Sequence, residues 1–482
     1  MTLSSLLKDV EIVEFQGNID VKVSGIAFDS KKVKPGDVFV CISGFKTDGH
    51  IFAKAALENG AVAIVAERVI PNTAVTVAVV KNTRYALAHM AAEYYKHPYR
   101  EFKLIGITGT NGKTTTTYLV KTIMESLGQK VGLIGTNQNI IGDESIPSRH
   151  TTPDSLELMQ LFDRMAKKGA DCVVMEVSSH SLALDRVAAC KFDIGAFTNV
   201  TQDHLDFHET MDKYIEAKAR LFEMCKVGVI NFDDPAFEKM TAKSNCDIIS
   251  YSTKDQAGVF AENIVYKADG VEFDLLYNGD SVRIDLAIPG EFSVYNALTA
   301  AGCCLAAGAT LSQVARGLKA ATGVKGRVEV VKTNTDYTVI IDYAHTPDGL
   351  VNILKTIRGF AKGRIITLFG CGGDRDKTKR PLMGRIAGEL SDFCVVTSDN
   401  PRSEEPSEII KDILAGMEKT DCEYRVIENR FEAIEFALDN ARKDDIILLA
   451  GKGHELYQIL KDRTIVFDER EIVLKLIESS EG

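Results

Sequence analysis

The stretch GITGTNGKTTTT, residues 106–117, decides how the rest of the chain is interpreted. In the common phosphate-binding loop, four residues separate the first glycine from the Gly-Lys-Ser/Thr group. The corresponding position here is Ile107, and the glycines stand instead at Gly106, Gly109 and Gly112. The spacing is a variant of the motif, and the kind of nucleotide enzyme that uses it has to be inferred from the rest of the chain.

The residues around this stretch favour a phosphate site. An apolar run, FKLIGIT, predicts a buried strand before the loop, and a helix is expected from about Thr114 to a stop at Gly128. Backbone N–H groups of such a loop and the helix N-terminus bind phosphate oxygens. Lys113 is predicted to contact the β- and γ-phosphates, and Thr114 to place its hydroxyl on Mg²⁺. A glycine-rich turn without a ligand is the alternative, but both flanking elements that the motif requires are present.

The composition limits the possible functions. The chain has 482 residues, of which 45% are hydrophobic and 26% charged, so we expect a globular protein of two to four domains. Its net charge of −11 argues against a nucleic-acid surface. Ten scattered cysteines without a C-x-x-C pair predict reduced thiols. We expect a cytoplasmic monomer with no signal peptide and no membrane span.

The pattern of elements predicts an α/β fold in three segments. Residues 1–98 mix short strands with a helix, and residues 99–326 begin with the glycine loop and include a small antiparallel patch near VYKADGVEFDLLYNGDSVRIDLAI. In residues 327–482, four apolar strands run directly into Gly, Asp, Arg or His: TVIIDYAH, RIITLFGCGGDRD, FCVVTSDNPR and DIILLAGKGHE. Ligands bind beyond the carboxyl ends of parallel strands, so these four ends are expected to form one rim of one site.

Two polar residues at strand ends are candidate metal ligands. Glu176 ends the run CVVMEV, and His204 follows the strand GAFTNV. Mg²⁺ prefers oxygen ligands, so a histidine ligand would be unusual. Taken alone, each is more often structural, the acid as a helix cap and the histidine as a hydrogen-bonded side chain. Their position after successive strands near the loop makes them better candidates for metal ligands.

Nine motifs in fixed order give the chain a family resemblance. They are GITGTNGKTTTT, EVSSHSLALDRV, FTNVTQDHLDFH, YIEAKARLF, GEFSVYNALTAAG, DYAHTPDGL, GCGGDRDKTKRPLMG, DNPRSEEP and GKGHE. Together they resemble the Mur ligases of peptidoglycan synthesis, whose loop has the spacing G-x-x-G-x-x-G-K-T. The resemblance covers essentially the whole chain and is strongest to the members that add diaminopimelate to a UDP-N-acetylmuramoyl dipeptide.

The resemblance implies an activity and an architecture. ATP phosphorylates a substrate carboxylate to an acyl phosphate, and an amine then displaces phosphate to form an amide. The implied domains are a small uridine-nucleotide-binding domain (1–98), a central ATP-binding domain with a mostly parallel sheet (99–326) and a C-terminal Rossmann-like domain that binds the amino acid (327–482). The implied substrates are ATP, UDP-N-acetylmuramoyl-L-Ala-D-Glu and meso-diaminopimelate, with two Mg²⁺ ions.

The same resemblance assigns candidate residues. The ATP positions are Gly109, Thr110, Asn111, Gly112, Lys113, Thr114, Thr115, Asn296, Arg327, Asp342 and His345. Those that match contacts to the UDP-muramyl substrate are Ser30, Thr151, Thr152, Ser178 and Arg186, while Leu184 and His150 depart from the amide side chains of some relatives. The metal and catalytic positions are Lys113, Thr114, Glu176, His204 and Lys218.

Lys218, in EAKARLF, is the most unusual of these positions. The matching lysine of the family is carbamylated, and the resulting carboxylate-like group supports the second Mg²⁺. A bare ammonium would repel a divalent cation, which gives the modification a physical reason. A solvated helix lysine is the alternative that the residue alone would favour.

The motif DNPRSEEP bears on the incoming amino acid. Diaminopimelate differs from lysine by a second carboxylate, which a guanidinium can bind through two parallel hydrogen bonds. Arg402 stands where diaminopimelate-adding members carry arginine, with the rest of the implied pocket formed by Arg375, Asp399, Asn400, Pro401, Gly451 and Glu455. Glu455 is suited to the distal ammonium. The alternative is that Arg402 caps the helix starting near Pro406, or pairs with Glu404 or Glu405.

Three other functions remain open from the sequence. The chain could be the same ligase using L-lysine, or another ligase of the superfamily, such as a folylpolyglutamate synthetase. The uridine-type first domain and the DNPR motif argue against another ligase. A phosphate-loop ATPase switch that forms no bond belongs to a different class, and it would leave the polar strand ends of the third segment without a use.

Overall fold

The protein is described by a computed structural model that covers residues 1–44, 47–71, 73–148, 150–267 and 269–480. The chain forms two compact units. The first comprises Met1–Gly258 with Thr299–Ala309, and the second comprises Val259–Leu298 with Thr310–Gly482. Strands and helices alternate along the chain in both units, and the sheets are mostly parallel, so the predicted α/β class is confirmed.

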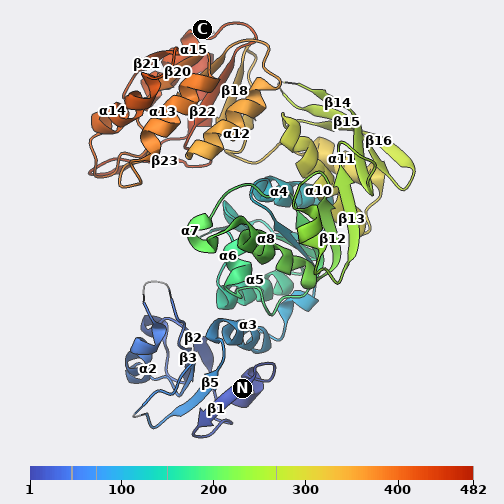
Figure 1. The fold of residues 1–482 in the computed structure, drawn as a ribbon, viewed down its shortest axis with the longest axis vertical. Coiled ribbons are helices and arrows are strands. Elements are labelled where there is room, and N and C mark those ends of the chain that lie inside the picture. The colour runs from blue at the N-terminus through green and yellow to red at the C-terminus, as the bar shows by residue number, and fades with distance from the viewer. Residues whose placement is uncertain (45–46, 72, 149, 268, 481–482) are drawn as a thin grey trace. The chain divides into compact units, whose positions relative to one another are not determined.

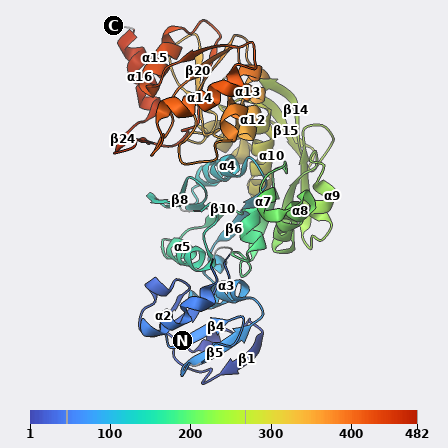
Figure 2. The same ribbon diagram turned by 60° about the vertical axis from the view of Figure 1, so that its left-hand side comes forward.

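The first unit begins with a five-stranded sheet between two layers of helices. Its elements are α1 (Leu3–Leu6), β1 (Ile12–Gln16), β2 (Gly25–Ala27), β3 (Asp37–Val40), α2 (Ala53–Glu58), β4 (Ala63–Ala66), β5 (Thr76–Val80) and α3 (Thr83–Tyr94). The strand order is β1-β5-β4-β3-β2, with only β1 antiparallel to its neighbour. Because β3 and β4 are apolar on both faces, one face packs against α1 and α3 and the other against α2 (Figure 2).

The central sheet of the first unit follows (Figure 1). Its elements are β6 (Lys103–Thr108), α4 (Lys113–Glu125), β7 (Val131–Ile134), β8 (Gln138–Ile141), β9 (Glu144–Pro147), α5 (Ser155–Lys167), β10 (Cys172–Glu176), α6 (Ser179–Ala183), β11 (Phe192–Phe197), α7 (Leu205–His208), α8 (Met211–Ala219), β12 (Cys225–Asn231), α9 (Phe237–Thr241) and β13 (Asp247–Ser252). Within this unit the strands lie in the order β13-β12-β11-β6-β10-β7-β8-β9. Strands β13 to β7 are parallel, and β8 and β9 continue the sheet as an antiparallel hairpin.

Strand β6 is the point at which the chain changes direction across this sheet. It lies between β10 and β11, and the chain passes to the β7 side before it crosses to β11. Glu176 at the end of β10 pairs in register with Ile107, and Phe197 at the end of β11 pairs with Thr108. The glycine loop after β6 therefore meets the residues that follow both neighbouring strands, as expected at a switch point.

The second unit begins with the antiparallel patch predicted from its turn signals. Strands β14 (Val259–Tyr266), β15 (Val271–Tyr277) and β16 (Asp280–Leu286) pair as an antiparallel meander. Helix α10 (Glu291–Ala306) follows, and its residues from Thr299 onward belong to the first unit. Helix α11 (Leu311–Ala320) begins with a capping box between Thr310 and Gln313.

The C-terminal sheet contains the four predicted strands. Its elements are β17 (Glu329–Val331), β18 (Thr338–Asp342), α12 (Pro347–Arg358), β19 (Ile365–Phe369), α13 (Lys379–Leu390), β20 (Phe393–Val396), α14 (Pro406–Met417), β21 (Glu423–Val426), α15 (Arg430–Asp439), β22 (Ile446–Ala450) and α16 (Glu469–Ser480), with a separate hairpin of β23 (Tyr457–Ile459) and β24 (Thr464–Val466). The strand order is β17-β18-β22-β19-β20-β21, and all but β17 are parallel. The polar ends of β18, β22, β19 and β20 therefore lie along one edge, as predicted.

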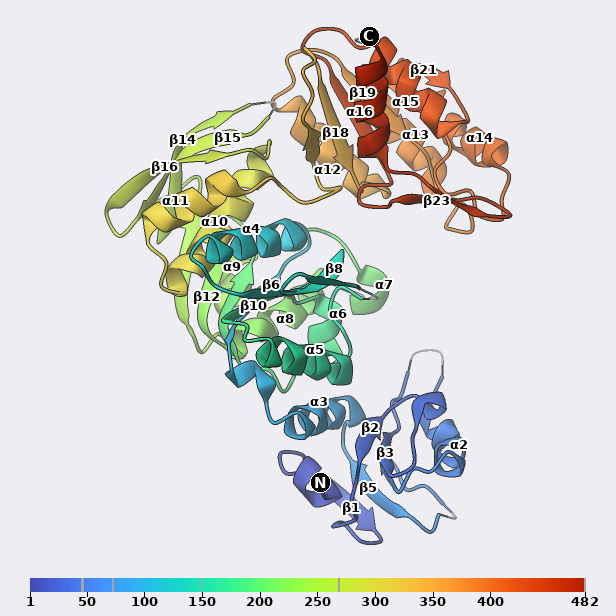
Figure 3. The same cartoon turned by 180° about the vertical axis from the view of Figure 1, so that it is seen from behind.

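Helices cover both faces of the C-terminal sheet. Helices α12, α13 and α14 pack on one face, and α15 and α16 pack on the other (Figure 3). Each core is formed by alternate residues of the same apolar strands, which is the pattern that a parallel sheet buried on both faces requires. Among the described residues, no helix has the length and apolarity needed to cross a bilayer.

Candidate active site

The glycine loop is anchored by residues that follow β11. Gly109 has φ 149°, and a Cβ added there would lie 1.9 Å from Thr198 Oγ1, so only glycine fits. The N–H of Thr110 donates to the carbonyl of Asn199 at 2.8 Å, and the N–H of Asn111 donates to Asn199 Oδ1 at 3.0 Å. Thr198 and Asn199 were not predicted as site residues, although they lie in the motif that ends β11.

Lys113 lies at the start of α4, directly after Gly112, whose φ is 85°. Its Nζ donates to the carbonyls of Gly109 at 2.9 Å and Thr110 at 2.8 Å. The ammonium therefore lies against the inside of its own loop. Thr115 is the third residue of helix α4. This places the predicted phosphate-binding groups together.

Glu176 is a buried carboxylate held by three donors. The residue is 1% exposed, and it accepts from Thr114 Oγ1 at 2.9 Å, from the Thr136 N–H at 2.8 Å and from Thr136 Oγ1 at 3.0 Å. Thr114 and Glu176, which were predicted separately as metal ligands near the loop, are thus in direct contact. Thr136 was not predicted, although it follows the apolar strand β7 just as the other polar residues follow theirs.

Lys218 occupies a buried position on α8. It is 1% exposed, its Nζ donates to the Gly109 carbonyl at 2.9 Å, and the same Nζ lies 4.3 Å from the centre of the Tyr214 ring. Burial, and then the charge of Lys113, lower the pKa of Lys218 well below its usual value, against an opposing effect of Asp203. The interpretation of Lys218 as a solvated helix lysine is therefore wrong.

His204 lies near this group on a more open part of the rim. It has φ 53° at the start of α7, and its side chain is 47% exposed. Its ring centre is 4.8 Å from that of His180 and 6.2 Å from that of Tyr214, and its Nε2 is 3.5 Å from the Asp203 carboxylate.

The residues present partly fit a magnesium ion. Thr114 and Glu176 supply adjacent hard oxygen atoms, which Mg²⁺ prefers. An ammonium on Lys218 would oppose a cation here. Among the described residues, no group of three or more His, Cys, Asp or Glu side chains is arranged to hold a metal. The donor set suits the ion if Lys218 carries a negative group instead of a positive one.

The predicted contacts to the UDP-muramyl substrate extend from Glu176. Thr152 Oγ1 donates to the Glu176 carbonyl at 2.8 Å and accepts from the Ser178 N–H at 3.0 Å. Arg186 Nη1 donates to the Thr152 carbonyl at 3.0 Å, and the hydroxyls of Thr136 and Thr151 are 3.1 Å apart. Thr151, Thr152, Ser178 and Arg186 thus form one network with the carboxylate at the loop.

A small cavity adjoins this network on the side of the N-terminal sheet. It is lined by Phe28, Ile42, Arg84, Leu87, Asp154, Ser155, Leu184 and Arg186. Arg186 Nε pairs with Asp154 at 3.0 Å. Burial, and then the charge of Arg186, lower the pKa of Arg84, which was not predicted as a site residue. Ser30 lies elsewhere, at the start of a 3-10 helix capped by Asp29, and His150 is exposed.

The remaining ATP positions lie in the second unit. Asp342 ends β18 and accepts from the N–H groups of Val328 and Ala344, both at 2.8 Å. Burial raises the pKa of Asp342, and the charge of Arg327 opposes this. Arg327 Cζ lies 5.2 Å from the centre of the Tyr343 ring, and His345 Nδ1 lies 2.8 Å from the Tyr343 carbonyl oxygen. Arg327, Asp342 and His345 are thus together, and Asn296 is buried on α10.

Several residues predicted to contact the amino acid lie together at the ends of β20 and β22. Asn400 Nδ2 donates to Glu455 Oε2 at 2.8 Å, and the Asn400 N–H lies 2.6 Å from Asp399 Oδ1. Gly451 has φ 114°, and a Cβ there would lie 2.6 Å from Asp399 Oδ2. Fully buried Lys452 donates to Asn400 Oδ1 at 3.1 Å and lies 3.4 Å from Glu455 Oε2. Lys452 was not predicted, although it lies in the GKGHE motif.

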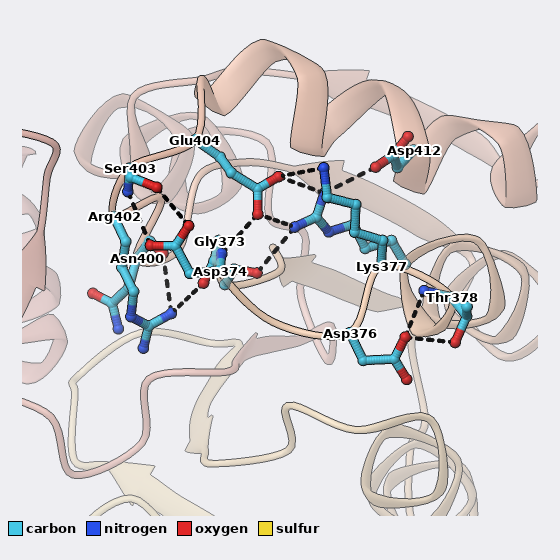
Figure 4. Close-up of polar contacts among 12 residues, drawn as sticks. Gly373, Asp374, Asp376, Lys377, Thr378, Asn400, Arg402, Ser403, Glu404 and Asp412 are labelled. Atoms are coloured by element: carbon cyan, nitrogen blue, oxygen red, sulfur yellow. Dashed lines mark hydrogen bonds and ion pairs between the residues drawn. The ribbon is translucent and has the colours of Figure 1, made fainter.

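Arg402 turns its guanidinium to backbone oxygens. It has φ 52°, and Nη1 donates to the Gly373 carbonyl at 2.8 Å and to the Asn400 carbonyl at 3.5 Å (Figure 4). Its neighbours Glu404 and Glu405 are engaged by other residues, Glu404 by Arg380 and Lys377 and Glu405 by Lys461.

Both alternative interpretations of Arg402 are therefore wrong. Among the described residues it forms no ion pair with a carboxylate, and α14 begins after Glu405 without a side-chain cap. Pro401 is buried beside it, and Arg375 is exposed on the neighbouring turn.

Comparison with known proteins covers the whole chain. Family models match residues 22–95 (Mur ligase family, catalytic domain), 107–304 (Mur ligase middle domain) and 326–453 (Mur ligase, glutamate ligase domain). The UDP-N-acetylmuramoyl-L-alanyl-D-glutamate–2,6-diaminopimelate ligase of Caldanaerobacter subterraneus is 52% identical over 100% of both chains. A ligase of the same name from Clostridium acetobutylicum is 51% identical over 99% of both.

Solved structures agree with this result. A structure of a UDP-N-acetylmuramoyl-L-alanyl-D-glutamate–2,6-diaminopimelate ligase matches with a TM-score of 0.76 and 32% identity, over 100% of this chain and 99% of that one. The D-alanyl-D-alanyl-adding ligase of Acinetobacter baumannii shares the fold, with a TM-score of 0.61 at 19% identity over 99% and 98% of the two chains. With half of its residues identical to those of full-length relatives, the chain belongs to the Mur ligase family.

Proposed function

We propose that this protein is an ATP-dependent ligase that joins meso-diaminopimelate to UDP-N-acetylmuramoyl-L-alanyl-D-glutamate. The names of the relatives at 52% and 51% identity support this activity. The observation that carries the choice of amino acid is Arg402, a cation at the rim without a carboxylate partner among the described residues. A carboxylate on the incoming amino acid would supply that partner.

The reaction that we propose needs little covalent chemistry from the protein. The glutamate carboxylate of the dipeptide takes the γ-phosphoryl group of ATP, which makes it an acyl phosphate and releases ADP. The amine of diaminopimelate then attacks the acyl carbon, and phosphate leaves as the amide forms. Both steps concentrate negative charge on phosphoryl and carbonyl oxygens, so catalysis consists mainly of positioning and charge neutralisation.

We assign phosphate binding to the loop and to Lys113. The loop N–H groups lie at the N-terminus of α4, where the partial positive charge of a helix favours anions. Thr114, Glu176 and His204 would hold Mg²⁺, which supplies charge neutralisation at the phosphates when it is bound. Thr136 orients Glu176 through two hydrogen bonds and thus supports this position.

We further propose that Lys218 is carbamylated. Its amine is buried beside a second lysine that donates to the same carbonyl, so an ammonium would be poorly compensated. A neutral amine can attack CO₂, forming an N–C bond and losing one proton to leave a carbamate anion. That anion would remove the repulsion between Lys218 and Lys113 and would give the metal site a further oxygen ligand.

For the amino acid we propose two charged contacts. Arg402 would bind the far carboxylate, and Glu455, held by Asn400, would accept the distal ammonium. Lys452 would keep the Asn400 amide turned toward Glu455, because it donates to the amide oxygen. Free thiols at all ten cysteines are consistent with the cytoplasmic location that we propose.

The first prediction concerns bond formation. Phosphate release should require ATP, the UDP-muramyl dipeptide and diaminopimelate together, and Lys113→Ala should lower turnover roughly a hundredfold to a thousandfold because phosphate charge loses its partner. A coupled phosphate assay across omitted substrates measures this, with circular dichroism to show that the variant is folded. ATP turnover that is equally fast without the dipeptide would contradict the ligase and favour the ATPase switch.

The second prediction concerns Lys218. Lys218→Ala should be nearly inactive and partly rescued by formate or acetate, which can occupy the vacated space as carboxylates. The wild-type enzyme supplied with ¹³C-bicarbonate should show a carbamate carbon signal that Lys218→Arg lacks. An active, magnesium-loaded enzyme with an unmodified Lys218 by mass spectrometry would disprove the modification.

The third prediction concerns selectivity. The enzyme should prefer meso-diaminopimelate to L-lysine by roughly a thousandfold or more in kcat/KM, because lysine leaves the Arg402 guanidinium unpaired. Arg402→Ala should reduce the difference in kcat/KM between the two amino acids, mainly by lowering the kcat/KM for diaminopimelate. Arg385→Ala, which removes an exposed arginine paired with Glu389 on α13, is the control and should change neither value. Equal use of both amino acids by the unmutated enzyme would overturn the assignment.

A further inference from the structure

Two turns that follow neighbouring strands are joined beside Arg402 (Figure 4). The first, residues 372–374, follows β19 and is named the glycine turn. The second, residues 400–403, follows β20 and is named the arginine turn. The Gly373 N–H donates to the Asn400 carbonyl at 2.9 Å. A Cβ on Gly373 would lie 1.9 Å from the Pro401 carbonyl oxygen, so the two backbones are in direct contact.

Side chains fasten the same two turns. Ser403 Oγ donates to Asp374 Oδ1 at 2.5 Å, and the Ser403 N–H donates to Asp374 Oδ2 at 3.2 Å. In the same direction, Arg402 Nη1 donates to the Gly373 carbonyl. The position of the guanidinium is thus tied to the position of the glycine turn.

Both turns contain a residue in the left-handed region. Asp374 has φ 54° and Arg402 has φ 52°. This conformation is unfavourable for a residue with a side chain and persists only where surrounding contacts hold it. The arrangement of Arg402 therefore depends on groups outside its own turn.

Glu404 supplies the contact that holds the glycine turn. Its Oε1 accepts from the Asp374 N–H at 2.7 Å and from Arg380 Nη2 at 2.8 Å, and its Oε2 accepts from Arg380 Nη1 at 3.0 Å. Lys377 lies 3.1 Å from the same Oε2. Arg380 is fully buried on α13 and also pairs with Asp412 of α14 at 2.9 Å. The carboxylate is therefore fixed to the turn and to α13, and Arg380 links it further to α14.

The same contact decides which cation Glu404 neutralises. Glu404 is two residues from Arg402, but Arg380 binds it through both carboxylate oxygens. Hydrogen bonds from Arg380 lower the pKa of Glu404 to about 2, so it remains ionised and bound to Arg380 at neutral pH. Arg402 is consequently not paired with Glu404, and among the described residues it forms no ion pair with a carboxylate. Asp374 lies close enough to be affected by it: hydrogen bonds from Ser403, and then the charge of Arg402, lower the pKa of Asp374.

We propose that Glu404 is a positioning residue for the amino-acid subsite, where Arg380 holds it so that Arg402 keeps its guanidinium for the far carboxylate of the incoming amino acid. This inference rests on the proposed function, because Arg402 acts on the amino acid there. Glu404 touches no reacting atom. Its effect should therefore appear in the binding of one substrate and not in the chemical step.

Glu404→Gln tests the inference. The amide of glutamine places an N–H donor opposite a donor of Arg380 or opposite the Asp374 N–H. At least one of the hydrogen bonds that Glu404 accepts must therefore be lost. We expect the KM for diaminopimelate to rise about tenfold, the scale of one charge-assisted hydrogen bond. The kcat and the KM values for ATP and the UDP-muramyl dipeptide should stay within about twofold. Glu405→Gln is the matched control, because its carboxylate pairs with Lys461 in solvent, and it should leave every value unchanged.

A second variant keeps the test valid if Glu404→Gln does not fold around buried Arg380. Asp374→Asn lies on the exposed turn, tolerates the left-handed conformation and loses one of the two acceptors for Ser403. It should raise the KM for diaminopimelate in the same direction, by a smaller factor. An unchanged KM for diaminopimelate in a folded variant, or an equal loss in all parameters, would overturn the inference. Failure of the unmutated enzyme to use diaminopimelate would overturn the proposed function instead.

Discussion

Two cations at the predicted sites form no ion pair with a carboxylate among the described residues, and the proposed ligands of the protein depend on them. Lys218 is buried against the Gly109 carbonyl, and Arg402 donates to the carbonyls of Gly373 and Asn400. The chain as a whole is acidic, with a net charge of −11, and exposed cations such as Lys239, Lys243 and Arg385 pair with acidic side chains. Positive charge that stays uncompensated in such a chain is costly unless an anion completes the site. The proposed carbamate, phosphates and substrate carboxylate would each serve that purpose.

Parallel strands bring these charges to the edges where ligands bind. In the first unit, β6, β10 and β11 deliver the glycine loop, Glu176 and Thr198 to one edge, and the loop is fastened there by hydrogen bonds from the neighbouring strand ends. In the second unit, β18, β22, β19 and β20 do the same for Asp342, Gly451, the glycine turn and the arginine turn. A glycine is required wherever two such ends touch, as at Gly109 and Gly373.

The sequence predicted those features that depend on local pattern. Apolar runs ending in polar residues located β6, β10, β11 and the four C-terminal strands, and the loop spacing located Lys113 and Thr114. It could not identify Thr136, Lys452 or the bond between Glu404 and Arg380, because each depends on which strand ends become neighbours in the folded sheet. For the same reason, the sequence left open a pairing of Arg402 with Glu404, which Arg380 prevents.

The proposed chemistry depends on one step, in which the enzyme activates a carboxylate by phosphorylating it. The most direct measurement uses UDP-N-acetylmuramoyl-L-alanyl-D-glutamate labelled with ¹⁸O in its glutamate carboxylates, incubated with ATP, Mg²⁺ and diaminopimelate, followed by mass analysis of the phosphate released. We expect one ¹⁸O atom in each phosphate, because the oxygen that bridged carbon and phosphorus leaves with the phosphoryl group. Phosphate that carries oxygen from solvent water and none from the substrate would contradict this step.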